Sequence, residues 1–118
     1  MTRHIRRGSI WWANLNPGNG TTPGKTRPVL IMQNQALLDA GHPSTVIIPL
    51  TTNIIDDAAP LRLRVPAQGV LEKDSDLLID QIRAIDNRRL VRGPILQLDD
   101  DFMDLVNNAL GEVLGMIE

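Results

Sequence analysis

Apolar and polar residues alternate along several short stretches of this chain, the pattern of β-strands that bury one face. The clearest stretch is 61–65, which alternates without a break. Its apolar residues are expected to face a core and its two arginines to face water, namely Leu61, Leu63 and Val65 against Arg62 and Arg64. Short apolar runs rich in β-branched residues predict further strands over 9–15, 27–34, 45–50, 76–85 (broken or bulged near Asp80) and 94–98.

The C-terminal segment changes to helical spacing. Three consecutive aspartates, 99–101, suit a helix N-terminus, because free amides and the macrodipole favour negative charge there. Shorter helical turns are expected over 35–40 and 87–90, and loops over 16–25 and 53–60. The fold class is therefore mainly β with α, a small antiparallel sheet curled into a barrel and covered by the helix. The helix should bury one apolar stripe, made of Phe102, Leu105, Val106, Ala109, Leu110, Val113 and Ile117.

The composition is that of one ordinary globular domain over residues 1–118, with 42% hydrophobic and 22% charged residues. The absence of cysteine excludes a disulfide scaffold, a thiolate metal site and a cysteine nucleophile. No apolar run is long enough for a signal segment or a membrane span, so we expect a cytoplasmic protein with no membrane partner. The small size leaves much surface exposed, which favours dimerisation.

The net charge of −2 argues at first against a nucleic-acid partner. The charges are unevenly distributed, however. Residues 1–34 carry five bases and no acid, residues 83–98 carry four arginines and one acid, and residues 99–118 carry six acids and no base. The two basic regions would suit one positive surface, and scattered solvated charges account for the pattern equally well.

Arg27 and Thr51 are the leading candidates for chemistry. Arg27 precedes one apolar, β-branched run and Thr51 follows the next, with Thr52 and Asn53 extending the polar cluster. A permanent cation beside a hydroxyl suits a reaction at a phosphodiester, because charge builds on the phosphoryl oxygens as the bond breaks. The plain alternatives are a cation that merely begins a strand and a threonine that merely ends one.

A second polar pair, Asp80 and Gln81, interrupts an apolar strand. A carboxylate in such a position is expected either to be buried and paired or to line a groove, with Arg83 as the partner in both cases.

Two adjacent tryptophans and two separated histidines complete the chemical inventory. Trp11 and Trp12 should point to opposite faces of a strand, so at most one packs in the core. The other would lie exposed or at an interface, where it could stack on a base. His4 and His42 occupy unrelated segments without carboxylate company, so we expect no metal site and no cofactor.

A set of short motifs, in order along nearly the whole chain, resembles the MazF/PemK family of toxin endoribonucleases. The motifs are Arg7-Gly8-Ser9-Ile10-Trp11-Trp12, Leu15-Asn16-Pro17, Arg27-Pro28-Val29-Leu30, Ile48-Pro49-Leu50-Thr51, Lys73-Asp74-Ser75, Asp80-Gln81-Ile82-Arg83 and Arg89-Leu90. The resemblance implies an SH3-like barrel of the CcdB/MazF type, a homodimer and a cognate MazE-like antitoxin with an acidic flexible segment. It also implies sequence-specific, metal-independent cleavage of single-stranded RNA, leaving a 2′,3′-cyclic phosphate and a 5′-hydroxyl.

Carried over by motif, the family's catalytic arginine and threonine fall on Arg27 and Thr51, in agreement with the candidates from the residues themselves. The resemblance also assigns RNA contact to Asp80 and Gln81, and we expect further RNA contacts at Thr22, Lys25, Thr52, Asn53 and Arg83. In one place the chain departs from the family. Many members carry Ser-Glu-Gln in the loop before the catalytic arginine, where this chain reads Thr21-Thr22-Pro23. The loop acid is absent, and the changed loop should alter which bases are read.

Two other functions remain as alternatives. One is a non-enzymatic gyrase poison resembling CcdB, but that relative relies on a C-terminal Trp-Gly-Ile and this chain ends at 114–118 without tryptophan. The other is an inactive SH3-like interaction module, which would need an aromatic-lined groove that three aromatic residues supply poorly.

Overall fold

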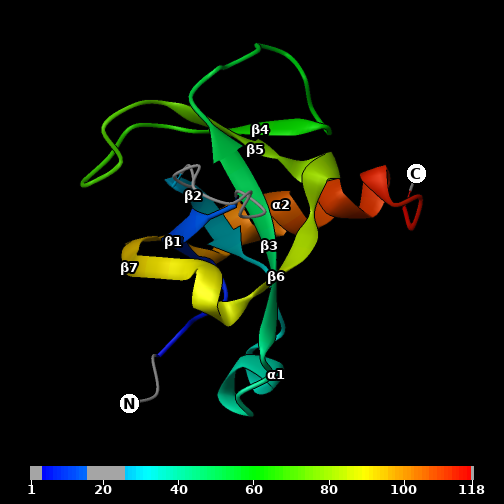
Figure 1. Cartoon of the computed structure of the whole chain (residues 1–118). Helices are drawn as coiled ribbons and strands as arrows, with labels where there is room; N and C mark the ends of the chain where they lie inside the picture. Colours follow the sequence, from blue (N-terminus) through cyan, green and yellow to red (C-terminus); the bar gives the residue numbers. More distant parts are fainter. Residues whose placement is uncertain (1–3, 16–25, 118) are drawn as a thin grey trace.

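The computed structural model describes residues 4–15 and 26–117, and this part of the chain forms one curled sheet with helices (Figure 1). Its first half contains β1 (Ser9–Asn14), β2 (Thr26–Ile31), α1 (Gln35–Asp39) and β3 (Ser44–Thr51). Its second half contains β4 (Arg62–Val65), β5 (Ser75–Leu78), the 3₁₀ helix η1 (Ile79–Gln81), β6 (Arg83–Asp86), a second 3₁₀ helix η2 (Asn87–Arg89), β7 (Leu90–Gln97) and α2 (Asp100–Val113).

The strands pair antiparallel in the order β4-β5-β3-β2-β1-β7, and β6 also pairs with β3. The long strand β3 organises the curl. Its first half pairs with β6 and its end with β5, while β2 lies along its other edge. The C-terminal helix α2 lies against the sheet (Figure 1). The predicted fold class, a curled antiparallel sheet with a C-terminal helix, is confirmed.

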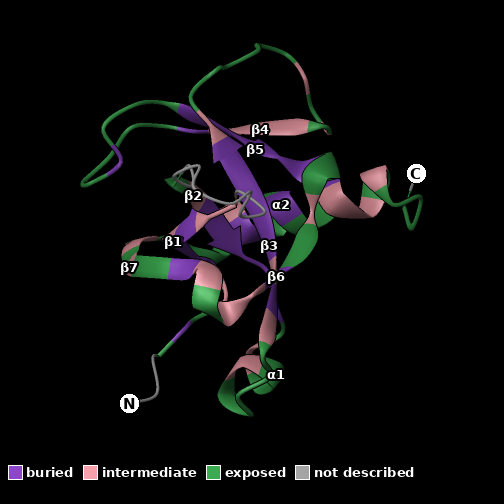
Figure 2. Cartoon of the chain, in the orientation of Figure 1, coloured by how far each residue is buried: buried purple, intermediate pink, exposed green. Residues whose placement is uncertain are grey.

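Alternation along the central strands produces two apolar layers on opposite faces of the sheet, and burial is concentrated there (Figure 2). Neighbours in one strand separate, so Leu30 joins one layer and Val29 the other. The layer that includes α2 contains Ile10, Leu30, Ile48, Leu50, Leu77, Met103, Val106 and Ala109. The opposite layer contains Trp11, Ala13, Val29, Ile31, Ile47, Ile85 and Leu90. The ends of β2 and β3 therefore project from a scaffold that is packed on both sides.

The expected break in the long strand 76–85 is confirmed, since η1 separates β5 from β6 at Asp80. The last strand was predicted too short. It runs over Leu90–Gln97 rather than 94–98, because pairing with β1 carries it through Gly93 and Pro94.

The predicted apolar stripe of the helix is wrong at three positions. Leu105 is 56% exposed, and Ile117 lies beyond the end of α2 and is 45% exposed. Met103, which the stripe omitted, is buried against the sheet. The buried face of α2 follows 103, 106 and 109, and Leu105 is turned about 100° from Val106. In the part of the chain that the structure covers, no helix is both long and apolar enough to cross a membrane.

Candidate nucleic-acid interface

The best candidate site is a groove of about 630 Å³ at the end of the sheet where β2 begins and β3 ends. Exposed Arg27 enters it from β2, and half-buried Thr51 enters it from β3. The described residues that line it are Trp12, Thr26, Arg27, Pro28, Leu50, Thr51, Thr52, Asn53, Val70, Leu71, Glu72, Lys73, Ser75 and Arg92.

Strand register explains why these two residues meet. Val29 pairs with Pro49 across β2 and β3, and extending that antiparallel register by two residues places Arg27 opposite Thr51. Residues opposite each other on neighbouring strands project to the same side of the sheet, within reach of one ligand. The two leading candidates from the sequence thus occupy one site.

A second wall of the groove comes from the far end of the chain. β1 pairs with β7, and this pairing sets Trp12 beside Arg92. The Arg92 guanidinium carbon lies 5.7 Å from the centroid of the Trp12 ring, within cation–π range. Trp11 points to the opposite face and is only 4% exposed, so the expectation that at most one tryptophan packs in the core is confirmed.

Thr51 also shapes the loop that follows it. Its Oγ1 accepts a hydrogen bond of 3.1 Å from the amide of Asn53, which turns the chain directly after β3. Thr52 and Asn53 are exposed on the groove wall.

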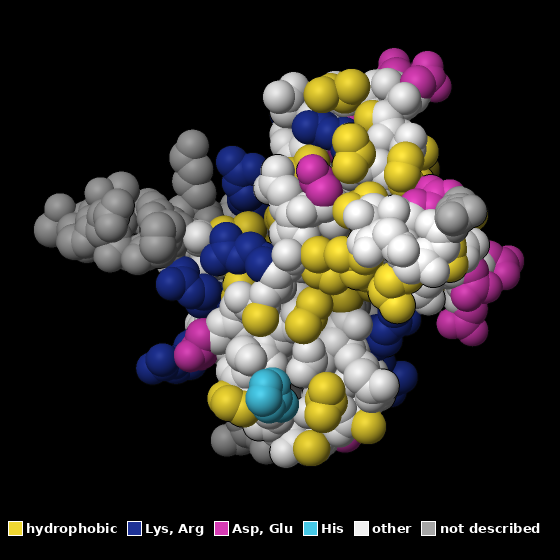
Figure 3. Space-filling view, turned by 90° about the vertical axis from the view of Figure 1, so that its right-hand side faces the viewer, with side chains coloured by type: hydrophobic (Ala, Val, Ile, Leu, Met, Phe, Trp, Pro, Cys, Tyr) yellow, Lys and Arg dark blue, Asp and Glu magenta, His cyan; other side chains and the backbone are white. Residues whose placement is uncertain are grey.

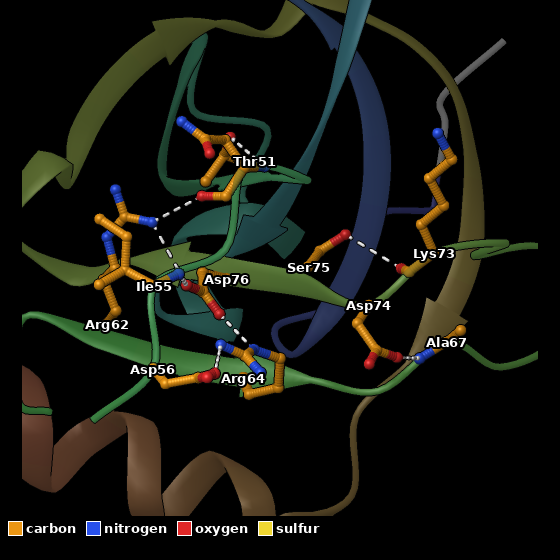
Figure 4. Close-up of polar contacts among 11 residues, drawn as sticks. Thr51, Ile55, Asp56, Arg62, Arg64, Ala67, Lys73, Asp74, Ser75 and Asp76 are labelled. Carbon is orange, nitrogen blue, oxygen red and sulfur yellow. Dashed lines mark hydrogen bonds and ion pairs between the residues drawn. The ribbon is translucent and has the colours of Figure 1, made fainter. Parts of the chain in front are cut away.

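Behind this loop lies a buried carboxylate, Asp76 of β5, which is 1% exposed (Figure 4). It accepts hydrogen bonds from Arg64 Nε at 2.6 Å, from the Ile55 amide at 2.9 Å and from Arg62 Nη1 at 3.3 Å. Burial alone would raise the pKa of Asp76, but the bonds from Arg64, Ile55 and Arg62 outweigh it, and the pKa is lowered. Arg62 and Arg64 therefore do not simply face water, as the alternation of 61–65 suggested.

The same alternation fails at its apolar end as well. Leu61 precedes β4 and is 50% exposed, so it does not face a core. Leu63 packs against the core and Val65 is fully buried, as expected. The apolar half of the pattern therefore holds only within the paired residues of β4.

Among the predicted contact residues, the structure brings Thr52 and Asn53 to Arg27 and Thr51, but it does not bring the second polar pair there. Asp80, Gln81 and Arg83 are exposed, lie in η1 and β6, and do not line the groove. Within the described residues no ion pair joins Asp80 to Arg83, so the expected pairing is wrong; their contact with RNA stays a prediction. Predicted contacts at Thr22 and Lys25 lie outside the described residues.

Sequence reasoning missed Glu72, Lys73 and Arg92 on the groove walls. Arg92 was detectable only as one member of the basic stretch 83–98, because the β1–β7 pairing that brings it to the groove is not local. With Arg27, Lys73 and Arg92 against Glu72, the groove has an excess of positive charge. Each of the two basic regions of the sequence contributes to it. For residues 4–15 and 26–117, no group of three histidine or acidic side chains is placed to hold a metal ion.

The groove offers a cation and a hydroxyl on neighbouring strands with an excess of positive charge, the kind of site that suits a nucleic-acid backbone. Residues 6–114 match the family described as PemK-like, MazF-like toxins of type II toxin–antitoxin systems, and the chain belongs to that family. The family expected from the sequence motifs is thus confirmed.

Relatives of known structure or description agree with this family. The chain is 36% identical to the endoribonuclease EndoA of Bacillus subtilis (strain 168), over 97% of each chain. Its fold is similar to MazF from Deinococcus radiodurans, with a TM-score of 0.75, 24% identity and coverage of 97% of this chain and 99% of that one. A MazE–MazF structure from the same organism gives a TM-score of 0.78 at 23% identity, covering 98% and 99% of the two chains.

Proposed function

We propose that this toxin is a sequence-specific endoribonuclease that cleaves single-stranded RNA in the groove between β2 and β3. The observation that carries the proposal is that Arg27 of β2 and Thr51 of β3, which are neighbouring strands, line the same positive groove. The relative EndoA is named an endoribonuclease, and it spans the same length at 36% identity. An open groove suits unstacked bases better than a duplex.

In the proposed reaction, the RNA supplies its own nucleophile. The 2′-hydroxyl next to the scissile phosphate gives its proton to water and attacks phosphorus, and the bond from phosphorus to the 5′-oxygen breaks as that oxygen takes a proton from water. The products are a 2′,3′-cyclic phosphate and a 5′-hydroxyl end. The enzyme contributes by holding this geometry and by stabilising the charge that develops on the phosphoryl oxygens, and this route requires no metal ion or cofactor.

Arg27 and Thr51 have separate roles in this scheme. The Arg27 guanidinium stabilises the pentacoordinate phosphorane, because its planar fork matches two phosphoryl oxygens. The Thr51 hydroxyl donates to a phosphoryl oxygen while its Oγ1 keeps accepting from the Asn53 amide. Neither residue is a neutral-pH acid or base, so positioning dominates the rate. Thr52, Asn53 and Arg92 contact the flanking RNA.

Two protein partners are proposed, an antitoxin and a second copy of this chain. A cognate MazE-like antitoxin with an acidic flexible segment competes with RNA for the positive groove; MazE–MazF complexes are among the similar structures. A homodimer would cover the exposed apolar side chains that follow α2, which are Leu114, Met116 and Ile117. Hydrophobic side chains gather on the face of the molecule drawn in Figure 3. The cytoplasm is the compartment in which such a toxin meets its RNA.

The test is cleavage of a long single-stranded RNA in EDTA by wild type, Arg27→Ala and Thr51→Val, with cut sites mapped and end groups identified. Arg88→Ala is the matched control, because Arg88 is exposed and pairs with Asp86 away from the groove. We expect site-specific cuts with 5′-hydroxyl ends from wild type and Arg88→Ala. Arg27→Ala should lose at least about 100-fold in rate, the usual effect of removing one stabilising group.

A folded Arg27→Ala variant that cleaves like wild type would overturn the site assignment. A folded wild type that leaves RNA intact but causes gyrase-dependent DNA breaks would overturn the ribonuclease and favour the CcdB-like poison.

A further inference from the structure

Asp76 has no place in the groove chemistry, yet it holds the groove loop at several points. The carboxylate is buried in β5, and one of its oxygens accepts from the Ile55 amide at 2.9 Å. Arg62, which bonds to that same oxygen, also donates from Nη1 to the Asn53 carbonyl at 2.9 Å. Arg64, bonded to the other oxygen, donates from Nη2 to the side chain of Asp56 at 2.9 Å. The loop 53–56 is thus tied to β4 and β5 through one carboxylate (Figure 4).

This network reaches the proposed catalytic hydroxyl by two short routes. Asp76 is the direct cross-strand partner of Thr51 in the β3–β5 ladder. Asn53, whose carbonyl is held by Arg62, gives its amide to Thr51 Oγ1 at 3.1 Å. Both backbone polar groups of Asn53 are therefore fixed, one by the network and one by the threonine. A shift of the loop would turn or release the hydroxyl.

Stability alone is a weak reason for such a network. Removing a carboxylate from water is costly, and apolar residues of similar volume often serve a core equally well or better. Three donors that converge on one carboxylate do, however, fix the loop 53–56 in a single position. Burial raises the pKa of Asp76, but the bonds from Arg64, Ile55 and Arg62 outweigh that effect and lower it, so the carboxylate stays charged throughout the neutral range.

We propose that Asp76, acting with Arg62, is a positioning residue that sets the place of Thr51 and of the loop 53–56 for RNA cleavage. The inference rests on the proposed ribonuclease function. Asp76 does not touch the RNA. Its contribution should appear in kcat rather than in KM, because misplacing a reacting group by about 1 Å costs up to about 100-fold in rate.

The test combines single-turnover cleavage with a double-mutant cycle. Asp76→Asn keeps the size of the side chain and removes the charge, and Arg62→Gln removes the tie to Asn53 while leaving the Arg64–Asp76 contact. Each should lower kcat by about 10- to 100-fold with KM within about 2-fold. In a Thr51→Ala background, Asp76→Asn should cause little further loss, because both changes remove the same interaction.

Asp86→Asn is the matched control, since it breaks an Asp–Arg pair that lies away from the groove, and it should leave both parameters unchanged. An activity-independent measurement follows hydrogen exchange at the amides of Asn53 and Ile55. Exchange there should become at least about 10-fold faster in Asp76→Asn, while the amides of β1 and β2 keep their protection.

Several results would overturn the proposal. Folded Asp76→Asn protein with wild-type kcat, or losses from Asp76→Asn and Thr51→Ala that simply multiply, would show that Asp76 does not act through Thr51. Unchanged exchange at Asn53 and Ile55 would show that it does not hold the loop. A wild type that cannot cleave RNA would instead refute the proposed function, and the exchange result would still decide whether Asp76 positions the loop.

Discussion

Replacing Gly93 by alanine should destabilise the protein, although alanine is the smallest possible addition. Gly93 lies in β7 directly over the Trp11 ring. A Cβ built there would lie 2.5, 2.7 and 2.9 Å from Cδ2, Cγ and Cε3 of that ring. Ordinary carbon–carbon contacts begin near 3.5 Å, so ring and strand would have to separate by about 1 Å. Trp11 is 4% exposed within an apolar layer, and the ring has little room to move.

Overpacking of this kind typically costs about 1–3 kcal/mol. Urea unfolding followed by far-UV circular dichroism measures that loss. For a protein of this size the midpoint should fall by about 1 M, given a denaturant slope of about 1–3 kcal/mol per M. All variants are compared at one protein concentration, because association would make the midpoint depend on concentration.

Gly111→Ala is the matched control in the same experiment. Its added Cβ would meet only Ile117, at 3.0 Å from Cγ1, and Ile117 is an exposed side chain that can move aside. Alanine is favoured over glycine in a helix by about 1 kcal/mol, so this variant should be neutral or more stable. If Gly93→Ala matched wild type, the close packing of β7 on Trp11 would be refuted.

Two further predictions concern charges. The hydrogen bond from the Arg88 side chain, helped by the Arg88 amide, lowers the pKa of Asp86 from 3.8 to about 2. The stabilisation from this pair is present above about pH 4 and lost as pH falls through 2, so the difference in urea midpoint between Asp86→Asn and wild type should be largest at pH 6 and much smaller at pH 2. Arg92→Ala should weaken RNA binding several-fold and reduce the slope of log Kd against log salt by about 0.7, because one phosphate contact is lost. Binding titrations at several salt concentrations measure this slope. An unchanged slope would show that Arg92 does not contact the RNA.

Local pattern was sufficient to predict much of the fold. Val29 to Ile31 and Ile47 to Leu50 are apolar and rich in β-branched residues, a pattern typical of buried strands, and both are strands. β7 was cut short because Gly93 and Pro94 weaken a strand pattern, whereas pairing with β1 extends the strand beyond them.

The candidate site could be predicted only as far as it is local. Arg27 and Thr51 stand at the ends of recognisable strands, so the sequence indicates both. Arg92 reaches the groove through the pairing of β1 with β7. The charge on Asp76 is satisfied because the β4–β5 register sets Arg64 directly opposite it. Such register cannot be read from composition or spacing, because it is decided by which strands meet.

The pairing of the first strand with the last also determines when a newly made chain can act. The Arg92 wall of the groove is about 80 residues from the Trp12 strand that it must join, so synthesis has to pass β7 before the groove can close. The helix that covers one layer of the sheet is made later still. A ribosome producing this chain therefore carries an incomplete groove until β7 has been made, so the nascent chain cannot act at that site before then.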